Sequence, residues 1–323
     1  MTRLSRRDVL TGITALVAMP AVAAPTWPDR PIKLIHGFPP GGPVDTASRI
    51  LAEGLSIRLG QGVIVEPKPG ATGMIAAAQI ARAAPDGYSL MTIPASYPPA
   101  AAMYRTLPFR PVEDFTMISK TVEYPIVLAT YSGHSIRTLG DLVKLANSSS
   151  LPLQYGTAGV GSLQHLAIEL FAKIANIRLQ HVPYRGGEPA IIDLLGKRVD
   201  FVPDPPTALI EYIRGGQLRA IAVTSGVRFF GLGDVPTIAE SGYPGYAVSG
   251  FQGLLAPAGL PAPILEKLNR EVGVVLADPS IVERLRNLGN NPRHSSPEEL
   301  RSNVSDDIAR WGKVIADAHI ERV

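Results

Sequence analysis

The sequence predicts an α/β fold with two lobes, each built on a parallel-rich sheet. The first observation behind this prediction is that short apolar runs typical of strands alternate with helical patterns along most of the chain. The second is that the alternation occurs in two rounds, which a tail of helices follows. The third is composition: 323 residues, with 46% apolar and 18% charged side chains, suffice for two ordinary domains with sizeable cores.

The first round of alternation begins at Pro31. Apolar β-type runs and segments with apolar residues at three- and four-residue spacing follow one another, as expected for strand–helix–strand units. Such units form parallel sheets with helices on their faces. We expect strands over 31–38, 62–67 and 88–93, and helices over 45–60 and 74–84.

A second round with the same pattern begins at Pro125. Its apolar runs are again short, and each is followed by a helical segment. We expect strands over 125–130, 152–156, 178–183, 199–203 and 218–225, and helices over 138–147, 163–175, 189–197 and 207–216.

The tail has a different character. After Ser225 the chain is rich in glycine and proline, which indicates connections around a single strand. Ser296 followed by Pro297 is a good start for the last helix. We expect a strand near 250–256 and helices over 262–278, 280–290 and 296–318.

The tail most simply returns to the first lobe, which leaves two crossovers as a hinge. The candidate hinge segments lie near Glu123–Val127 and near Ser249–Leu255. We therefore expect residues 25–125 and 250–323 in lobe 1 and residues 126–249 in lobe 2. A cleft between two such lobes is the usual place for a small ligand.

The first 24 residues are expected to be an export signal. Arg6 and Arg7 precede an apolar run of about 16 residues, which is shorter than the roughly 20 of a spanning helix. Ala21–Ala23 offers an A-x-A cleavage site. The paired arginines favour the twin-arginine route, with a general secretory signal as the alternative. We expect cleavage near Ala23–Ala24 and a periplasmic location.

Charge and cysteine content limit the partners of the mature chain. The leader contributes +2 of the formal net charge of +3. No Lys/Arg-rich run remains after it, so nucleic acid is not an expected partner. Without cysteine the protein has no disulfides and no lipoprotein anchor. No other segment is long and apolar enough to span a membrane, so we expect a soluble protein. We also expect it to be a monomer.

The stretch "GFPPGGPVD" is the first candidate anion site. It joins the first expected strand to a helix, whose free N–H groups and positive dipole end attract an anion. Gly41 and Gly42 allow a carboxylate close to the backbone, while Pro39 and Pro40 keep the loop stiff. Asp45 lies in the first turn and either caps the helix or contacts the ligand.

The stretch "YGTAGVGSLQHL" over 155–166 is the second candidate. Its glycine order differs from that of dinucleotide-binding loops, and it lacks the lysine of a phosphate-binding loop. An anion held by backbone N–H groups and by the hydroxyls of Thr157 and Ser162 fits better. Ser162 is equally suited to be only the N-cap of its helix.

The stretch "HVPYRGGEPA" over 181–190 is the third candidate. A strand again runs through a turn into a helix, with Tyr184 and Arg185 before Gly186 and Gly187. The alternative for Arg185 is a solvated loop residue.

Asp204 ends a later expected strand. It either accepts a hydrogen bond from a ligand donor, such as an amino group, or caps the helix that follows.

Catalytic and metal-binding patterns are absent from the sequence. There is no G-x-S-x-G motif, and the six histidines have no spacing typical of metal ligands. Ser162 and His165 lie at helical i,i+3 spacing, but no acidic partner can be identified for them. We therefore expect no enzyme, no cofactor and no metal, and we keep an exported hydrolase using Ser162 and His165 as the rival function.

Seven motifs in the same order resemble the Bug family, the substrate-binding proteins of tripartite tricarboxylate transporters. The resemblance runs from Trp27 to Trp311, essentially the whole mature chain. The motifs are "PIKLIHGFPPGGPVD", "VEPKPGATGMIAA", "AAPDGYSL", "HVPYRGGEPAIIDLLGKRVDF", "GQLRAIAVTS", "DVPTIAESGYPGY" and "GLLAPAGLPAPILEKLN".

The resemblance implies a two-lobed periplasmic binding protein of type II, the Venus-flytrap kind. Such a protein binds a small carboxylate: a di- or tricarboxylate, an acidic amino acid or an aromatic acid. The implied partners are the membrane subunits of the transporter, and a periplasmic sensor for a signalling partner is a variant. The ligand-binding positions that carry over are Phe38, Pro40, Gly41, Gly42, Asp45, Thr157, Gly161, Ser162, His165, Tyr184, Arg185, Gly186, Gly187 and Asp204.

The chain departs from the family pattern at three places near the expected cleft rim. Arg185 stands where the family usually has lysine, and Pro205 follows Asp204 where the family often has asparagine. The loop over 94–104 is richer in proline than usual. The identity of the ligand is therefore the property that transfers least.

Overall fold

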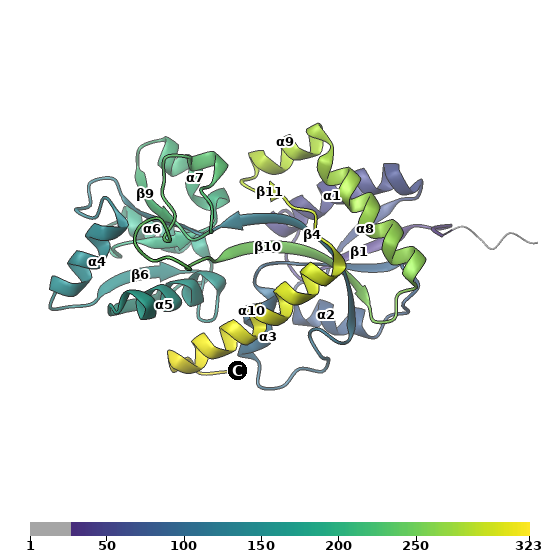
Figure 1. The fold of residues 1–323 in the computed structure, drawn as a ribbon, viewed down its shortest axis with the longest axis horizontal. Helices are drawn as coiled ribbons and strands as arrows, with labels where there is room; N and C mark the ends of the chain where they lie inside the picture. The colour runs from purple at the N-terminus through teal and green to yellow at the C-terminus, as the bar shows by residue number, and fades with distance from the viewer. Residues whose placement is uncertain (1–26) are drawn as a thin grey trace, which may run out of the picture.

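The computed structural model describes residues 27–323, and the export signal expected over residues 1–24 lies outside them. The described residues form two lobes placed side by side along the long axis of the molecule (Figure 1). No helix in this part of the chain is long and apolar enough to cross a membrane.

A six-stranded mixed sheet forms the centre of the first lobe. β1 lies parallel between β2 and β3, whereas β10 lies antiparallel between β3 and β4. β1 and β3 are apolar on both faces, as expected for strands with helices on each side. In order across the sheet the strands are β2 (Val63–Pro67), β1 (Ile32–His36), β3 (Ser89–Ile93), β10 (Ser249–Pro257), β4 (Phe115–Pro125) and β11 (Asn291–Pro292).

Each face of this sheet has its own core. Leu34 points into a core formed with α1, α8 and α9, and its neighbour Ile35 points into one formed with α2, α3 and the first half of α10. The helices are α1 (Pro43–Leu59), α2 (Met74–Ala81), α3 (Tyr97–Met103), α8 (Ala262–Ala277), α9 (Pro279–Asn287) and α10 (Pro297–Asp317), with a 3-10 turn η1 (Ala71–Gly73) before α2.

The second lobe holds two small sheets surrounded by helices. β5 is antiparallel to both β8 and β9, β6 is parallel to β7, and a bridge between Tyr155 and Phe201 links the two sheets. The elements are β5 (Val127–Tyr131), α4 (Leu139–Ser148), β6 (Leu153–Thr157), α5 (Leu163–Ala175), β7 (Leu179–Pro183), α6 (Gly187–Leu195), β8 (Val202–Asp204), α7 (Pro206–Arg214), β9 (Leu218–Val223) and the 3-10 turn η2 (Phe230–Leu232).

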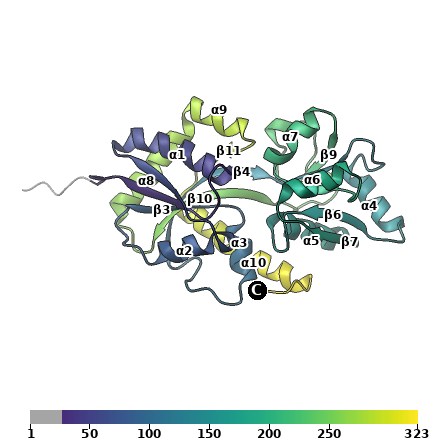
Figure 2. The ribbon, with the colours of Figure 1, turned by 180° about the vertical axis from the view of Figure 1, so that it is seen from behind.

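The paired strands β4 and β10 run between the lobes and form the hinge (Figure 2). Their pairing ends with Ser249 opposite Pro125, and β5 of the second lobe begins at Val127. The candidate hinge segment 249–255 lies within β10, and the segment 123–127 covers the end of β4 and the first residue of β5.

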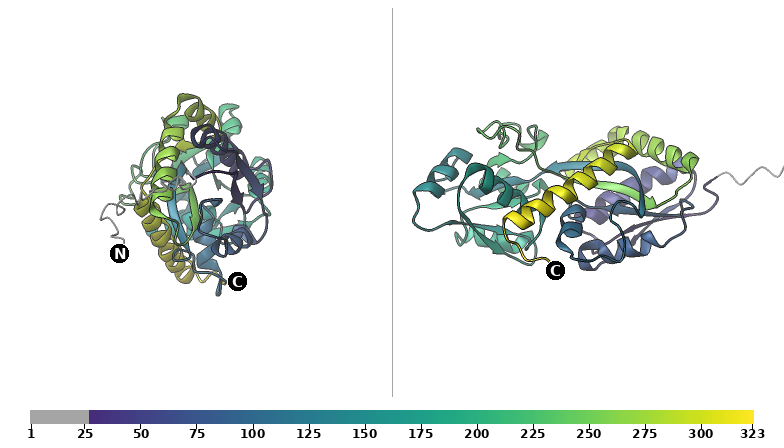
Figure 3. Two further views of the ribbon diagram at one scale, coloured as in Figure 1. Left: turned by 90° about the vertical axis from the view of Figure 1, so that its right-hand side faces the viewer. Right: turned by 60° about the horizontal axis from the view of Figure 1, so that its bottom comes forward.

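The last helix connects the lobes a third time (Figure 3). Leu300 and Val304, in the first half of α10, belong to a core of the first lobe. Trp311, Val314 and Ile315, in the second half, belong to the core of the second lobe. The division expected from the sequence, which assigns the whole tail to lobe 1, does not include this double attachment.

The predicted two-lobed α/β class is confirmed, and the expected elements begin and end within three residues of their observed bounds. The sheets are mixed, because β10 returns antiparallel beside β3 and β4 and because β5 is antiparallel to its neighbours. β4, α3 and β11 were not expected from the sequence.

The double attachment of α10 is testable by truncating its most buried side chain. Trp311 is fully buried, so Trp311→Ala is expected to lower the free energy of unfolding by about 3–5 kcal/mol in urea denaturation. Lys313→Ala on the exposed side of the same helix is the control and is expected to change it by less than about 0.5 kcal/mol. Equal, small effects of both changes would contradict a structural role for the second half of α10.

Candidate functional site

A cleft of about 260 Å³ lies between the two lobes. Both lobes contribute the first turns of helices to its walls, and the hinge strands contribute Tyr124 and Gln252. The lining is Phe38, Pro43, Val44, Pro94, Ala95, Ser96, Tyr124, Ile126, Leu163, Gln164, Pro205, Thr207, Gln252 and Asn290, all of which are neutral.

The N-termini of α1, α5 and α7 meet at this cleft. α1 and α7 have no side-chain cap, and each begins with a proline, which lacks an N–H group. The first backbone N–H groups of these helices therefore belong to Val44 and Thr207, and both residues line the cleft. Leu163, the first residue of α5, lines it as well. Free N–H groups and three positive helix ends suit an anion.

Asp45 holds the first loop together. Its carboxylate accepts hydrogen bonds from Gly41 N at 3.0 Å and from Arg49 Nε at 2.8 Å, and it lies 2.9 Å from His36 Nε2. The Arg49 guanidinium, with the Gly41 amide and His36, holds the pKa of Asp45 well below its usual range despite burial. Asp45 is therefore not the cap of α1, which has no side-chain cap, and its carboxylate instead fixes the loop before the helix through Gly41 and Arg49.

The remaining predicted residues of the first loop differ in their placement. Phe38 lines the cleft, whereas Pro40 and Gly41 are exposed. Gly41 has a φ of +79°, so any other residue there would strain the backbone. Gly42 is the N-cap of α1 and accepts a hydrogen bond from Thr46 N through its carbonyl oxygen.

In the second loop Ser162 is the N-cap of α5. Its Oγ accepts a hydrogen bond from His165 N at 3.2 Å, so Ser162 has the helix-capping role that the sequence also allowed for it. Thr157 is buried, and its Oγ1 lies 2.6 Å from His181 Nε2. Gly161 has a φ of +75° and packs against Met103 of the other lobe, where an added Cβ would lie 2.8 Å from Cγ.

The His165 side chain stabilises this loop through a hydrogen bond to its backbone. Its Nδ1 accepts a hydrogen bond from Gly161 N at 3.1 Å, and its ring stacks on His181 with 3.8 Å between centroids. Burial, with the charge of His181, lowers the pKa of His165 to about 3. The other ring nitrogen, Nε2, lies 3.8 Å from Glu169 Oε1, and Ser162 Oγ is bonded to the backbone N of His165 rather than to its ring.

The third loop lies beside Asp204. Arg185 is exposed and makes no ion pair with any residue of the described chain. Tyr184 donates a hydrogen bond from its hydroxyl to Asp193 at 2.8 Å. Gly186 has a φ of +115° and precedes α6, and a Cβ on Gly187 would collide with the Asp204 carboxyl group. Gly187 is thus the residue in this loop whose small size the structure requires.

Asp204 is buried beside the cleft, since its neighbour in the chain, Pro205, is part of the cleft lining. Its Oδ1 accepts a hydrogen bond from Gln164 Nε2 at 3.2 Å, and Gln164 lines the cleft. Burial raises the pKa of Asp204 to about 7. The N-cap of α7 is Pro205 without a side-chain cap, so Asp204 is not the helix cap.

Most of the lining was not predicted from the sequence. Tyr124 and Gln252 lie in the two candidate hinge segments, and Gly250 leaves room for the Tyr124 ring, with which a Cβ would collide. Pro94–Ser96 belongs to the proline-rich loop. The signal that could have found Val44 is its place in the first turn after a glycine-rich loop. Among residues 27–323 no cluster of side chains could hold a metal ion.

Comparisons with known proteins find one matching protein family and related sequences. Residues 47–320 match the model of the tripartite tricarboxylate transporter family receptor. Protein BugT of Bordetella pertussis is 34% identical over 98% of this chain and 98% of its own length.

Two solved structures show the same overall arrangement. The periplasmic binding protein BugD is 34% identical, with a TM-score of 0.75 over 92% of this chain and 100% of BugD. Rpa4515 of R. palustris, solved with adipate, is 32% identical, with a TM-score of 0.79 over 92% of this chain and 100% of that protein.

The buried histidine pair makes stability depend on pH. The folded-state pKa values of His165 and His181 are lowered to about 3 and about 4, below the ordinary value of about 6.5. As pH falls below about 6.5, the unfolded state takes up protons first, so stability present at pH 7 is lost towards pH 4. Each unit of pKa difference corresponds to about 1.4 kcal/mol.

This loss is measured as the free energy of unfolding between pH 7 and pH 4.5, above the range in which Asp45 titrates. His181→Gln, which keeps a polar partner for Thr157, is expected to flatten the dependence. His319→Asn at an exposed position is the control and is expected to keep it. Asp204 takes up a proton in the folded state over the same range, because its pKa is raised to about 7, and it therefore opposes the loss. All three proteins accordingly carry Asp204→Asn as a common background. A flat profile for the background protein, with both histidines present, would show that the pair is not held neutral.

Proposed function

Because the chain belongs to the tripartite tricarboxylate transporter receptor family, confirming the resemblance to the Bug proteins, we propose that it captures a small carboxylate in the interlobe cleft for uptake by a transporter of this type. The observation that carries the proposal is the meeting of three helix N-termini at a cleft whose lining side chains are neutral. An anion there is held by backbone N–H groups, without a basic side chain.

The lining also favours an organic acid over an inorganic anion. Phe38, Val44 and Ile126 offer apolar contacts, while Ser96 and Gln252 offer hydrogen-bonding groups. Ligand sites commonly combine a mainly apolar lining with a few polar groups that set orientation. The adipate in the Rpa4515 structure, an α,ω-dicarboxylate on an apolar chain, has this chemistry. The proposal covers di- and tricarboxylates, acidic amino acids and aromatic acids.

In this proposal both lobes contact the ligand. Phe38 and the first turn of α1, which Gly41 and Gly42 precede, act from lobe 1, and the loops around Gly161 and Gly187 act from lobe 2. Asp204, which lies beside the cleft residue Gln164, accepts a hydrogen bond from a ligand donor. The other positions carried over from the family, Pro40, Asp45, Thr157, Ser162, His165, Tyr184, Arg185 and Gly186, shape or border these loops.

Ligand contacts in both lobes favour the closed arrangement over an open one, with β4 and β10 as the hinge. The closed form is then presented to the membrane subunits of a tripartite tricarboxylate transporter in the periplasm, after export through a twin-arginine signal over residues 1–24. A sensor that presents the same closed form to a signalling partner is the variant. A monomeric state is part of the proposal.

The first test is thermal melting of the mature protein with small carboxylates and their amides. A carboxylate that binds only the folded state stabilises it by about 2.7 kcal/mol at 100 times its dissociation constant. We expect at least one acid to raise the melting temperature and its amide to leave it unchanged. If no acid of the panel does so, or if the acid is consumed over time, the binding proposal fails.

The second test fills the cleft from the first turn of α1. Val44→Trp places a large side chain in the lining, and we expect it to weaken binding of the carboxylate found in the first test by at least about tenfold, or 1.4 kcal/mol. Ile57→Trp is the control, because Ile57 is 78% exposed on the same helix. Calorimetric titration measures both. Equal affinities of the two variants would place the ligand elsewhere.

A further inference from the structure

Two buried side-chain amides line the cleft without hydrogen-bond partners. Gln252 of β10 and Asn290, which precedes β11, are each 3% exposed, and both belong to the cleft lining. Within residues 27–323 neither side-chain amide makes a hydrogen bond, since the contact of Gln252 with Thr121 is made by its backbone oxygen. The amide atoms of both keep accessible surface. An unpaired amide at a buried position is costly, so both call for a polar partner that enters the cleft.

The two amides stand on either side of β4. In the sheet β4 lies between β10 and β11, and Val122 of β4 pairs with Gln252 on one side and with Pro292 on the other. The next pair of the β11 ladder brings Asn290 level with Tyr124. Neighbouring strands lie about 4.8 Å apart, so roughly 10 Å separates the backbones of the two amide residues. This spacing leaves room for one small group between their side chains.

Tyr124 does not fill this room. Its ring lies over Gly250 of β10, where an added Cβ would collide with it. The ring therefore leans towards β10 and away from Asn290, which stands on the other side of β4. Gly250 thus keeps the space between the two amides open.

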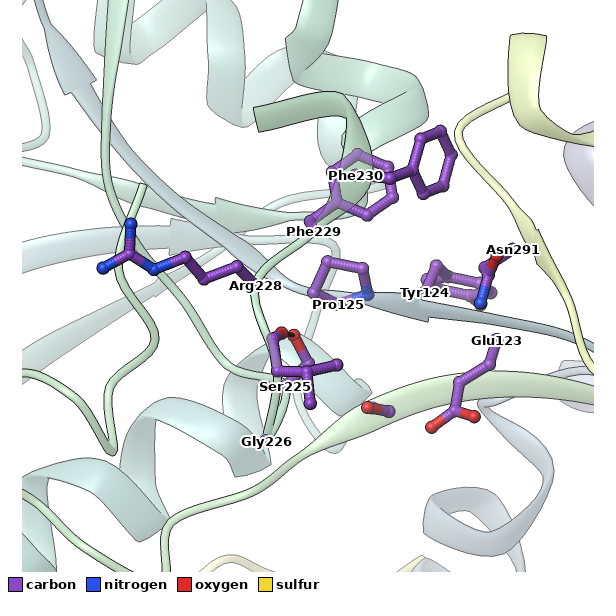
Figure 4. A pocket seen from close by; sticks show the side chains of 11 residues that line it. Glu123, Tyr124, Pro125, Ser225, Gly226, Arg228, Phe229, Phe230 and Asn291 are labelled. Carbon is purple, nitrogen blue, oxygen red and sulfur yellow. Dashed lines mark hydrogen bonds between the residues drawn. The ribbon is translucent and has the colours of Figure 1, made fainter. Parts of the chain in front are cut away.

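Charged side chains at the hinge belong to a neighbouring pocket of about 350 Å³. This pocket shares Tyr124 with the cleft and contains Asn291 (Figure 4). Its charged lining side chains are Glu123 and Arg228. Asn291 pairs with Glu123 in the ladder, and successive residues point to opposite faces, so Asn290 is turned to the cleft instead. A second carboxylate in the cleft would meet no basic side chain of the lining.

On the basis of the carboxylate function proposed for the cleft, we propose that Gln252 and Asn290 bind a carboxamide at the far end of the ligand, which is then the monoamide of a dicarboxylic acid. Each side-chain amide has an acceptor oxygen and an NH₂ group with two donors. A carboxamide offers the same combination and can pair with the donors and the acceptors of both residues. A carboxylate has acceptors only and would leave Gln252 Oε1 and Asn290 Oδ1 without donors.

The single carboxylate of such a ligand lies at the helix N-termini. There the backbone N–H groups of Val44 and Thr207 are the donors, while Phe38 and Ile126 contact the carbon chain. The negative charge is placed at positive helix ends, and the uncharged group is placed on the strands. This arrangement matches a lining that has hydrogen-bonding groups but no basic side chain.

Calorimetric titration of the mature protein with three matched compounds of one carbon skeleton tests the proposal. The compounds are the diacid, its monoamide and its diamide, for the succinic, glutaric and adipic skeletons, at about pH 8, where both carboxyl groups of a diacid are ionised. In at least one series we expect the monoamide to bind at least about tenfold more tightly than the diacid, because the diacid leaves buried acceptors unpaired. The diamide, which has no carboxylate, is expected not to bind.

Two variants test the assigned residues. Gln252→Met and Asn290→Leu replace an amide by an apolar side chain of similar size. Each is expected to weaken binding of the monoamide by about tenfold or more, so that its preference over the diacid disappears. Gln217→Met, at an exposed position outside the cleft lining, is the matched control and is expected to keep the preference. The comparison of ligands on the unmodified protein does not depend on the folding of any variant.

A diacid that binds as tightly as its monoamide in every series overturns this inference and leaves carboxylate capture in the cleft intact. The inference also fails if no monoamide binds although another carboxylate does, or if Gln252→Met and Asn290→Leu keep the preference, since water alone then fills the space between the amides. A diamide that binds as tightly as its monoamide would instead contradict carboxylate binding at the helix N-termini, and with it the proposed function.

Discussion

In the antiparallel pairing of β4 with β10, the side chains that face the cleft alternate with those on the opposite face of the two strands. Tyr124 and Gln252 belong to one face, and Glu123 and Phe251 to the other. A one-residue slip of this pairing would exchange the two sets. The register of these two strands therefore determines which of their side chains form the floor of the cleft.

The hinge is not free to bend by itself, because α10 is packed into both lobes. The apolar contacts of Leu300 and Val304 secure its first half, and those of Trp311 and Val314 secure its second. Movement of the lobes must shift or slide this helix, in the way that packed helices accommodate shear. Contact of Gly161 with Met103 across the lobes adds a further limit on closure.

Much of the fold could be predicted because periodicity of apolar residues reports burial directly. α5 is an example, since its expected and observed bounds are the same, 163–175. β4 was missed because its sequence, "FTMISKTVEYP", mixes apolar residues with Lys120 and Glu123, which face a polar cavity. α3 was missed because Pro98 and Pro99 look like a loop, although they lie in the first turn, where a missing N–H group costs little.

The site was predictable only in part. Glycine-rich loops before helices indicated the ends of the sheets at which the cleft lies, but the sequence does not tell which N–H groups face it. The role of Asp45 depends on Arg49, one turn further along the helix, and on His36, which no local pattern connects to it. The neutral state of His165 likewise depends on stacking with His181, which only the tertiary fold brings near. Asp204 and Gly187 approach each other for the same reason.

The attachment of α10 to both lobes also bears on the order in which the protein can fold. The second lobe is continuous in sequence, yet its core includes Trp311, from a helix that follows every other described element. Domains usually fold as units while the chain is being made. Here a core of each lobe is incomplete until the last helix has been synthesised. Apolar surface on both lobes therefore stays uncovered until this late segment packs against it.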